Sequence, residues 1–422
     1  MEDRGFRRSV AVIVALRLAP AVIVALANGR GVLGLPGYAY AAPTGDTYGF
    51  YAAAREFMTT WARAPVVSFA ASLVLLVGGA IGTRILWRRG KREGAVIVGA
   101  LGSAIFLAVW VHEMRSTGAG TIGWPIVWAL PLFPLRAVGV LGYLDAYYLG
   151  IAVLLVCNAA TVVATALIAR RLVPGRTSLL APSLLAIWPF MMLHLGEPGT
   201  VVYGSWLNDE GLNLYSEPLS TALVAVGLAL LVLHRFDPIC AAFAGILLGY
   251  AVVVRLSNIT IVIVCFVALL LAAAAPSVAA FALASVGVST IWFAFWPHGY
   301  VSLNRGSLSQ TTHDLFGSRY ILPSWRDSTV FGPRMLAILL PLAILGLYSL
   351  RRQPFEAWLL GAVVAVTGAF YSFYYYTALH PRFLFVALPS LFVLEAAGAA
   401  SLAAIVSATF RGDLPEEGRR SP

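Results

Sequence analysis

Residues 217–258 read EPLSTALVAVGLALLVLHRFDPICAAFAGILLGYAVVVRLSN. Two apolar runs, 217–234 and 238–254, are joined by a short link that contains Arg235 and Asp237. Each run is close to the length of about 20 residues that a helix needs to cross a bilayer. The interior of each run carries no charged side chain. This pattern predicts two consecutive membrane-spanning helices.

The same pattern recurs along the whole chain. Of its 422 residues, 60% are hydrophobic and only 11% are charged. In soluble proteins about 45–50% of the residues are apolar and about 25% are charged. The composition of this chain excludes a soluble globular protein, because the chain cannot cover its surface with polar groups. The sequence predicts an all-α, polytopic integral membrane protein with about twelve transmembrane helices. The other predicted spans are 9–28, 66–86, 94–112, 147–169, 178–195, 257–275, 277–296, 335–350, 355–372 and 383–409.

The distribution of charge predicts the orientation of these spans. Segments assigned to the inner side hold 17 basic and 8 acidic residues, and the outer segments hold 11 and 10. Because short cytoplasmic loops carry an excess of arginine and lysine, this bias places both termini in the cytoplasm. The net charge of +10 therefore reflects topology, and we expect no nucleic-acid partner. The inner segments are the N-terminal arm, 84–93, 170–176, 235–237, 351–356 and the tail from Arg411.

The outer connections are much longer than the inner ones. They span residues 29–65, 113–146, 196–216 and 297–334, and they are rich in tyrosine, tryptophan and acidic residues. Connections longer than about 12–15 residues are usually functional or disordered, and their aromatic content argues against disorder. We therefore expect any activity to face outward.

One acidic residue in the first outer loop is a candidate catalytic group. Asp46 precedes Tyr48 and a series of aromatic residues at helical spacing. One interpretation is that Asp46 caps a short interfacial helix. The alternative is that a carboxylate held just above the bilayer acts as a general base toward an acceptor hydroxyl.

Three cationic residues fall at predicted helix ends on the outer side. Arg255 lies between two apolar runs with almost no loop, and His380 and Arg382 flank Pro381. An arginine in such a place either extends its guanidinium to the membrane surface or binds an anion. Guanidinium groups bind phosphate in a bidentate geometry, so a phosphate or pyrophosphate partner is the second interpretation.

Other charged residues have simpler explanations. Asp209 and Glu210 are typical of solvated loops, and Glu217 lies where acidic residues favour a helix N-terminus. Arg17 and Glu395 lie inside predicted spans, where a charge is by default a functional hypothesis. The sequence identifies no partner for either residue.

Five short stretches together resemble the GT-C superfamily of membrane glycosyltransferases. In chain order they are 46–48 with the alanines 52–54, 158–160 leading to 169–172, 216–219, 245–258, and 380–384 with 388–389. Members of this superfamily use polyprenyl- or dolichyl-phosphate sugars outside the cytoplasm. The resemblance covers most of the chain in order and spacing, although each motif alone is short. It implies a GT-C-like fold in this chain.

The resemblance assigns roles to individual residues. Asp46 becomes the general base of an inverting transfer, with Glu113 as its rival for that role. Arg255 and Arg382, together with His380, become candidates for binding the phosphate of the lipid donor. The candidates for the substrate cavity are Tyr48, Glu113, Asp209, Glu210 and Glu217.

The resemblance also suggests an organisation and a set of partners. Residues 1–275 would form the transmembrane catalytic module with outer loop 29–65, and 276–410 the C-terminal helices with outer loop 297–334. Residues 411–422 would form a cytoplasmic tail. The implied partners are a polyprenyl-phosphate-linked sugar, a glycan, lipid or protein acceptor, and membrane lipids. The resemblance implies no particular cofactor, and it leaves open whether the enzyme uses a divalent metal ion. Because the arginine-rich, lysine-poor composition is typical of GC-rich genomes, we expect the sugar to be arabinose or mannose.

Three other classes of membrane protein fit the same composition. A transporter or flippase would also carry about twelve spans, but the chain shows no repeat between its two halves. A polymerase or ligase of glycan lipids would share the cationic outer face. A scaffold subunit of an envelope complex would need Asp46 only as a helix cap.

Overall fold

The structure is a computed structural model, and the residues that it describes are helical or lie in turns between helices, with no β-strand among them. This confirms the all-α prediction for this part of the chain. The described residues are 2–29, 66–92, 94–95, 97–99, 102, 123–124, 127–128, 143–195, 216–295, 317–327, 333–374 and 381–411.

Helices occupy the apolar runs that the sequence singled out. For example, α9 covers Glu217–Leu233 and α10 covers Pro238–Val254, within one residue of the predicted limits. The other α-helices are α1 (Glu2–Gly29), α3 (Val66–Arg88), α6 (Tyr143–Leu172), α7 (Leu180–Leu195), α11 (Ile259–Leu271), α12 (Ala275–Phe295), α15 (Ile321–Asp327), α16 (Pro333–Ser349), α17 (Pro354–Ser372) and α18 (Leu388–Arg411). The short 3₁₀ helices are η1 (Gly175–Leu179), η2 (Leu256–Asn258), η4 (Ser318–Tyr320), η5 (Leu350–Arg352) and η7 (Pro381–Ala387).

The last apolar run differs from the single helix that was predicted over 383–409. The chain first forms η7 and then the long helix α18, which begins at Leu388. Pro389 explains the break, because proline lacks an amide donor and is tolerated in the first turn of a helix but not in its interior. Most of the predicted span 94–112 lies outside the described residues.

Three helical segments within the described residues are long and apolar enough to cross a membrane. They are Ala152–Leu172, Pro354–Ser372 and Phe383–Phe410. Glu217–Leu233, Pro238–Val254, Leu256–Leu271 and Ala275–Thr290 are apolar but shorter. These lengths and compositions are consistent with association with a membrane.

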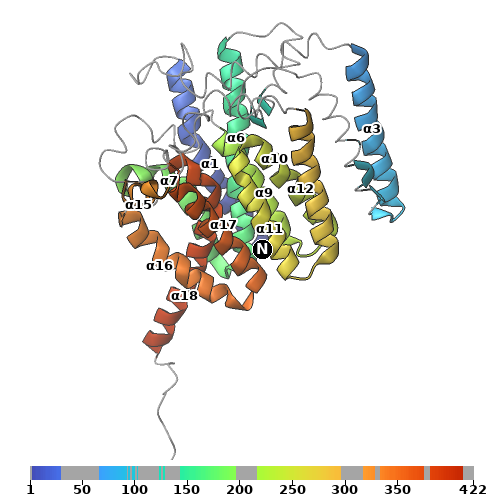
Figure 1. Ribbon diagram of the computed structural model, residues 1–422. Coiled ribbons are helices and arrows are strands. Elements are labelled where there is room, and N and C mark those ends of the chain that lie inside the picture. The colour runs from blue at the N-terminus through green and yellow to red at the C-terminus, as the bar shows by residue number, and fades with distance from the viewer. Residues whose placement is uncertain are drawn as a thin grey trace, which may run out of the picture.

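The helices pack around one continuous apolar core. Helix α9 contacts α6 on one side and α10 on the other, and α10 in turn packs along α12. Helix α18 contacts α16, α7 and α17, and α1 lies against α6 and α7. Figure 1 shows this bundle, with α3 standing apart from the other helices. Apolar side chains on α3 such as Val74, Val77 and Ile81 are exposed.

Close contact between α10 and α12 depends on two glycines four residues apart. A Cβ atom on Gly245 would lie 2.5 Å from the carbonyl oxygen of Phe281, and one on Gly249 would lie 2.6 Å from that of Ser285. Membrane helices commonly approach one another over such pairs of small residues. The backbone of α12 therefore occupies the space that side chains on α10 would need.

Gly249→Ala is expected to destabilise the protein by about 1–3 kcal/mol, because the added methyl group overlaps the backbone of α12. Gly287→Ala, on α12 itself, is the matched control, since a Cβ there meets nothing within 4 Å. That control is expected to gain about 0.5–1 kcal/mol from helix propensity. Thermal unfolding in detergent measures both variants. Equal melting temperatures for the two would contradict the packing described here.

Charged clusters lie at the two ends of α9. Just beyond its C-terminal end, Arg235 Nη1 lies 3.5 Å from Glu356 Oε1 at the start of α17, and Arg235 also packs on Phe236 and Phe355. The N-terminal end of α9 carries Glu217. The sequence assigned the first of these ends to the inner side and the second to the outer side.

Candidate functional site

Glu217 and Arg255 form an ion pair where α9 begins and α10 ends. Arg255 Nη1 contacts Glu217 Oε1, and the two side chains are only 17% and 6% exposed. Local sequence sets both positions. Pro218 suits the first turn of α9, where an acidic residue is also favoured. Arg255 adopts an extended backbone conformation that ends α10.

The surroundings of Arg255 keep its guanidinium charged. Burial alone would lower the pKa of Arg255, but the Glu217 carboxylate and the Tyr371 hydroxyl outweigh burial and raise that pKa above its ordinary value. The guanidinium carbon also lies 4.8 Å from the centre of the Phe383 ring, in a cation–π contact. The site therefore holds a permanent positive charge against an aromatic wall.

Asn258 fixes the backbone that presents Arg255. Its Nδ2 donates to the carbonyl oxygen of Ala251 at 2.8 Å and to Ser220 Oγ at 2.7 Å. The first bond is a second one to this carbonyl oxygen, which also accepts from the backbone N–H of Arg255 at 2.8 Å, so Asn258 reinforces the last turn of α10. The second bond ties that turn to α9, which carries Glu217. The asparagine is fully buried.

Helix α17 and η7 complete the wall of the site. Ser257 Oγ and Tyr371 Oη lie 2.6 Å apart and share a hydrogen bond. The Tyr371 ring stacks on the Phe383 ring with 5.6 Å between their centres. Trp325 Nε1 on α15 donates to Ser372 Oγ at 3.0 Å, so α15 also reaches this end of α17.

Part of the segment 113–146, which the sequence predicted to be an outer connection, also meets the end of α10. Tyr250 Oη donates to the carbonyl oxygen of Gly123 at 2.8 Å. A Cβ on Gly123 would lie 2.7 Å from the Cα of Val254, so only glycine fits at this contact. Trp124 is buried next to it. Gly123, in the segment 113–146, therefore contacts Val254, the residue that precedes Arg255 in the sequence.

A small cavity opens beside the ion pair. Its volume is about 10 Å³, which is close to the space of a single water molecule. A sugar phosphate cannot be enclosed there, so a ligand of that size would have to contact the pair from its exposed edge. The cavity is lined by Glu217, Ser220, Thr221, Arg255, Asn258, Tyr371, Phe383 and Val386.

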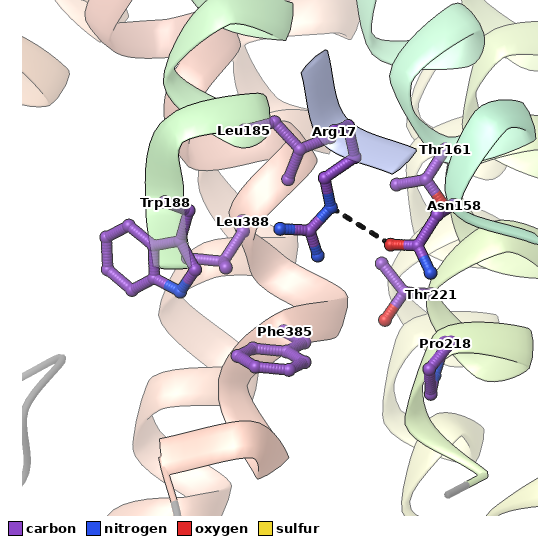
Figure 2. A pocket seen from close by; sticks show the side chains of 9 residues that line it. All are labelled: Arg17, Asn158, Thr161, Leu185, Trp188, Pro218, Thr221, Phe385 and Leu388. Carbon is purple, nitrogen blue, oxygen red and sulfur yellow. Dashed lines mark hydrogen bonds between the residues drawn. The ribbon is translucent and has the colours of Figure 1, made fainter. Parts of the chain in front are cut away.

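A second cavity lies around Arg17, on the other side of Thr221. Arg17 is buried in α1, and its Nε donates to Asn158 Oδ1 on α6 at 3.0 Å. Figure 2 shows the guanidinium between Trp188 on one side and Asn158 and Thr221 on the other. The cavity has a volume of about 20 Å³ and is lined by Arg17, Asn158, Thr161, Leu185, Trp188, Pro218, Thr221, Phe385 and Leu388.

The structure brings together some of the residues that the sequence proposed. Arg255 and Glu217, which the sequence treated as separate candidates, are direct partners. The backbone of Arg382 lies in η7, next to Phe383, which contacts Arg255. The Arg382 side chain lies outside the described part, as do Asp46, Tyr48, Glu113, Asp209, Glu210 and His380.

Several residues of the site were not identified from the sequence. Tyr371 and Ser220 carry no signal of their own, because each is an uncharged residue next to another hydroxyl-bearing residue in an apolar helix. The partner of Arg17 could have been found, since Asn158 is a polar residue inside another predicted span and buried polar groups tend to pair. Glu395 is buried in α18, and its Oε1 has no hydrogen-bond partner among the described residues.

Comparisons with known proteins do not identify a family for this chain. No protein-family model matches the chain, and no curated protein matches it. Within the described ranges, no group of three or more histidine, cysteine, aspartate or glutamate side chains is placed to hold a metal ion.

Proposed function

We propose that the protein is a polytopic membrane glycosyltransferase with a GT-C-like fold. In this proposal about twelve helices span the cell membrane, both termini are cytoplasmic, and the active site is extracytoplasmic. The enzyme transfers a sugar from a polyprenyl-phosphate donor to a glycan, lipid or protein acceptor. Arabinose and mannose are the first sugars to test.

One observation carries this proposal. Parts of three stretches that resemble the superfamily, 216–219, 245–258 and 380–384, meet at a single place: Arg255 pairs with Glu217 and packs on Phe383. These stretches are more than 160 residues apart at their extremes. The antiparallel packing of α9 and α10 by itself places Glu217 beside Arg255, so the contact of Arg255 with Phe383, from a distant stretch, is the part of this convergence that supports one functional site.

The chemistry of this place suits a lipid phosphate. A guanidinium has five N–H donors, so its contact with Glu217 leaves donors for a second anion. The partly exposed ring of Phe383, stacked on the buried ring of Tyr371, offers an apolar surface to the first prenyl units. The donor phosphate would bind at the exposed edge of Arg255, because the cavity behind it is no larger than a water molecule.

The proposed reaction is a single displacement. An acceptor hydroxyl oxygen attacks the anomeric carbon, the bond from that carbon to the phosphate oxygen breaks, and polyprenyl phosphate leaves. Asp46 takes the hydroxyl proton, and the configuration at the anomeric carbon inverts. Arg255 stabilises the charge on the departing phosphate.

Arg255→Lys is expected to weaken the binding of polyprenyl phosphate about tenfold, because lysine keeps the charge but loses the bidentate fork. Saturable binding of radiolabelled polyprenyl phosphate to the purified protein in nanodiscs measures this effect. Arg352→Lys, an exposed arginine in η5 at the other end of α17, is the control and should bind as the wild type does. Unchanged affinity in Arg255→Lys would remove Arg255 from the donor site.

A further inference from the structure

The cavity around Arg17 contains two buried polar atoms that need a partner. Trp188 Nε1 and Thr221 Oγ1 have no hydrogen-bond partner in the part of the chain that the structure describes. Their side chains are 1% and 6% exposed, and both line this cavity. Buried polar groups are nearly always hydrogen-bonded, so these two atoms point to an occupant.

The chemistry of the lining restricts what that occupant is. An indole nitrogen is only a donor, so the occupant must accept a hydrogen bond, which excludes a metal cation. The guanidinium of Arg17 lies between Trp188 and Thr221 in the lining of the same cavity (Figure 2). Donors around a positive charge favour an anion over a neutral acceptor, because charge-assisted hydrogen bonds are roughly twice as strong as neutral ones.

The size of the cavity restricts the occupant further. A water molecule needs about 10–15 Å³ of such space, and this cavity offers about 20 Å³. Phosphate, sulfate and carboxylates are too large to be enclosed. The remaining wall is apolar and is formed by Leu185, Phe385 and Leu388. Such a wall suits a spherical ion, because a spherical ion does not need hydrogen bonds from every direction.

We propose that this cavity is a binding site for one halide ion, chloride being the physiological one. The ion accepts hydrogen bonds from Trp188 Nε1 and Thr221 Oγ1 and neutralises charge beside Arg17. It would link four elements, because Arg17 lies on α1, Trp188 on α7, Thr221 on α9 and Phe385 on η7. This site is separate from the proposed donor site, although Thr221 lines both cavities.

The test compares the melting temperature of the purified full chain in nanodiscs in sodium chloride and in sodium gluconate at equal ionic strength. Chloride at about 100 times its dissociation constant is expected to raise the melting temperature by about 3 °C in a saturable manner. Gluconate is too large for the cavity and should have no such effect. Equal melting temperatures in the two salts would mean that water fills the cavity and would overturn the proposal.

Two variants and one control assign the effect to this cavity. Thr221→Val keeps the shape of the side chain but removes its hydroxyl, and Trp188→Phe keeps an aromatic ring but removes its donor. Both are expected to lose the chloride-dependent rise. Thr367→Val is the matched control, because Thr367 also has a buried hydroxyl without a partner among the described residues but lies on α17, away from the cavity. A chloride-dependent rise that survives in Thr221→Val and Trp188→Phe would overturn the assignment.

Discussion

Asp46→Asn is expected to abolish sugar transfer while leaving the protein folded. An amide cannot take the proton of the acceptor hydroxyl, and general-base catalysis contributes about 10²–10⁴-fold to a rate. The substitution changes one oxygen to nitrogen in the predicted outer loop 29–65, so the melting temperature should not move. The measurement is the rate of transfer from a polyprenyl-phosphate sugar, with the melting temperature recorded alongside.

Two further variants decide which carboxylate is the base. Glu56→Gln removes an acid from the same outer loop and should keep full activity. Glu113→Gln should also stay active if Asp46 is the base. An active Asp46→Asn together with an inactive Glu113→Gln would transfer the role to Glu113, and full activity in both would exclude either acid as the base.

Glu217→Ala is expected to destabilise the protein by about 3 kcal/mol. The substitution leaves the Arg255 guanidinium largely buried without its carboxylate, and removal of one member of a buried ion pair is strongly unfavourable. Arg255→Ala should cost a similar amount for the complementary reason. Arg352→Ala, an exposed arginine in η5, is the control and should change stability by less than about 0.5 kcal/mol.

The double variant Glu217→Ala/Arg255→Ala separates the ion pair from the other contacts of each residue. If the pair is coupled, the double variant will be more stable than the sum of the two single effects predicts, by at least about 1 kcal/mol. Thermal unfolding of all four proteins gives this coupling. Additive effects would mean that the two side chains contribute independently.

The positions of the helices could be predicted from the sequence because they depend on local properties. Helix α10 begins at Pro238 behind the capping residue Asp237 and ends at Arg255, which is where the apolar run is bounded by polar residues. Such boundaries follow from capping and from the length of uncharged runs. The break between η7 and α18 was missed, although Pro389 marks it.

The partners of the charged residues could not be predicted, because they depend on how distant segments pack. The sequence suggested an anionic partner for Arg255 without identifying a residue of the chain. In the structure Arg255 contacts the carboxylate of Glu217. Two polar bonds hold this geometry, from Asn258 to Ser220 and between Ser257 and Tyr371. The first spans 38 residues of the sequence and the second 114, so no local pattern reports either bond.

The central claim is that the chain transfers sugar from a polyprenyl phosphate, and the consumption of that donor tests it most directly. Purified protein would be mixed with radiolabelled polyprenyl-phosphate sugars isolated from the membranes of the source organism and with an envelope extract as acceptor. We predict that label moves from the lipid to the extract with wild-type protein and stays on the lipid with Asp46→Asn. Label that stays on the lipid with wild-type protein, or that crosses a sealed vesicle without leaving the lipid, would contradict the claim.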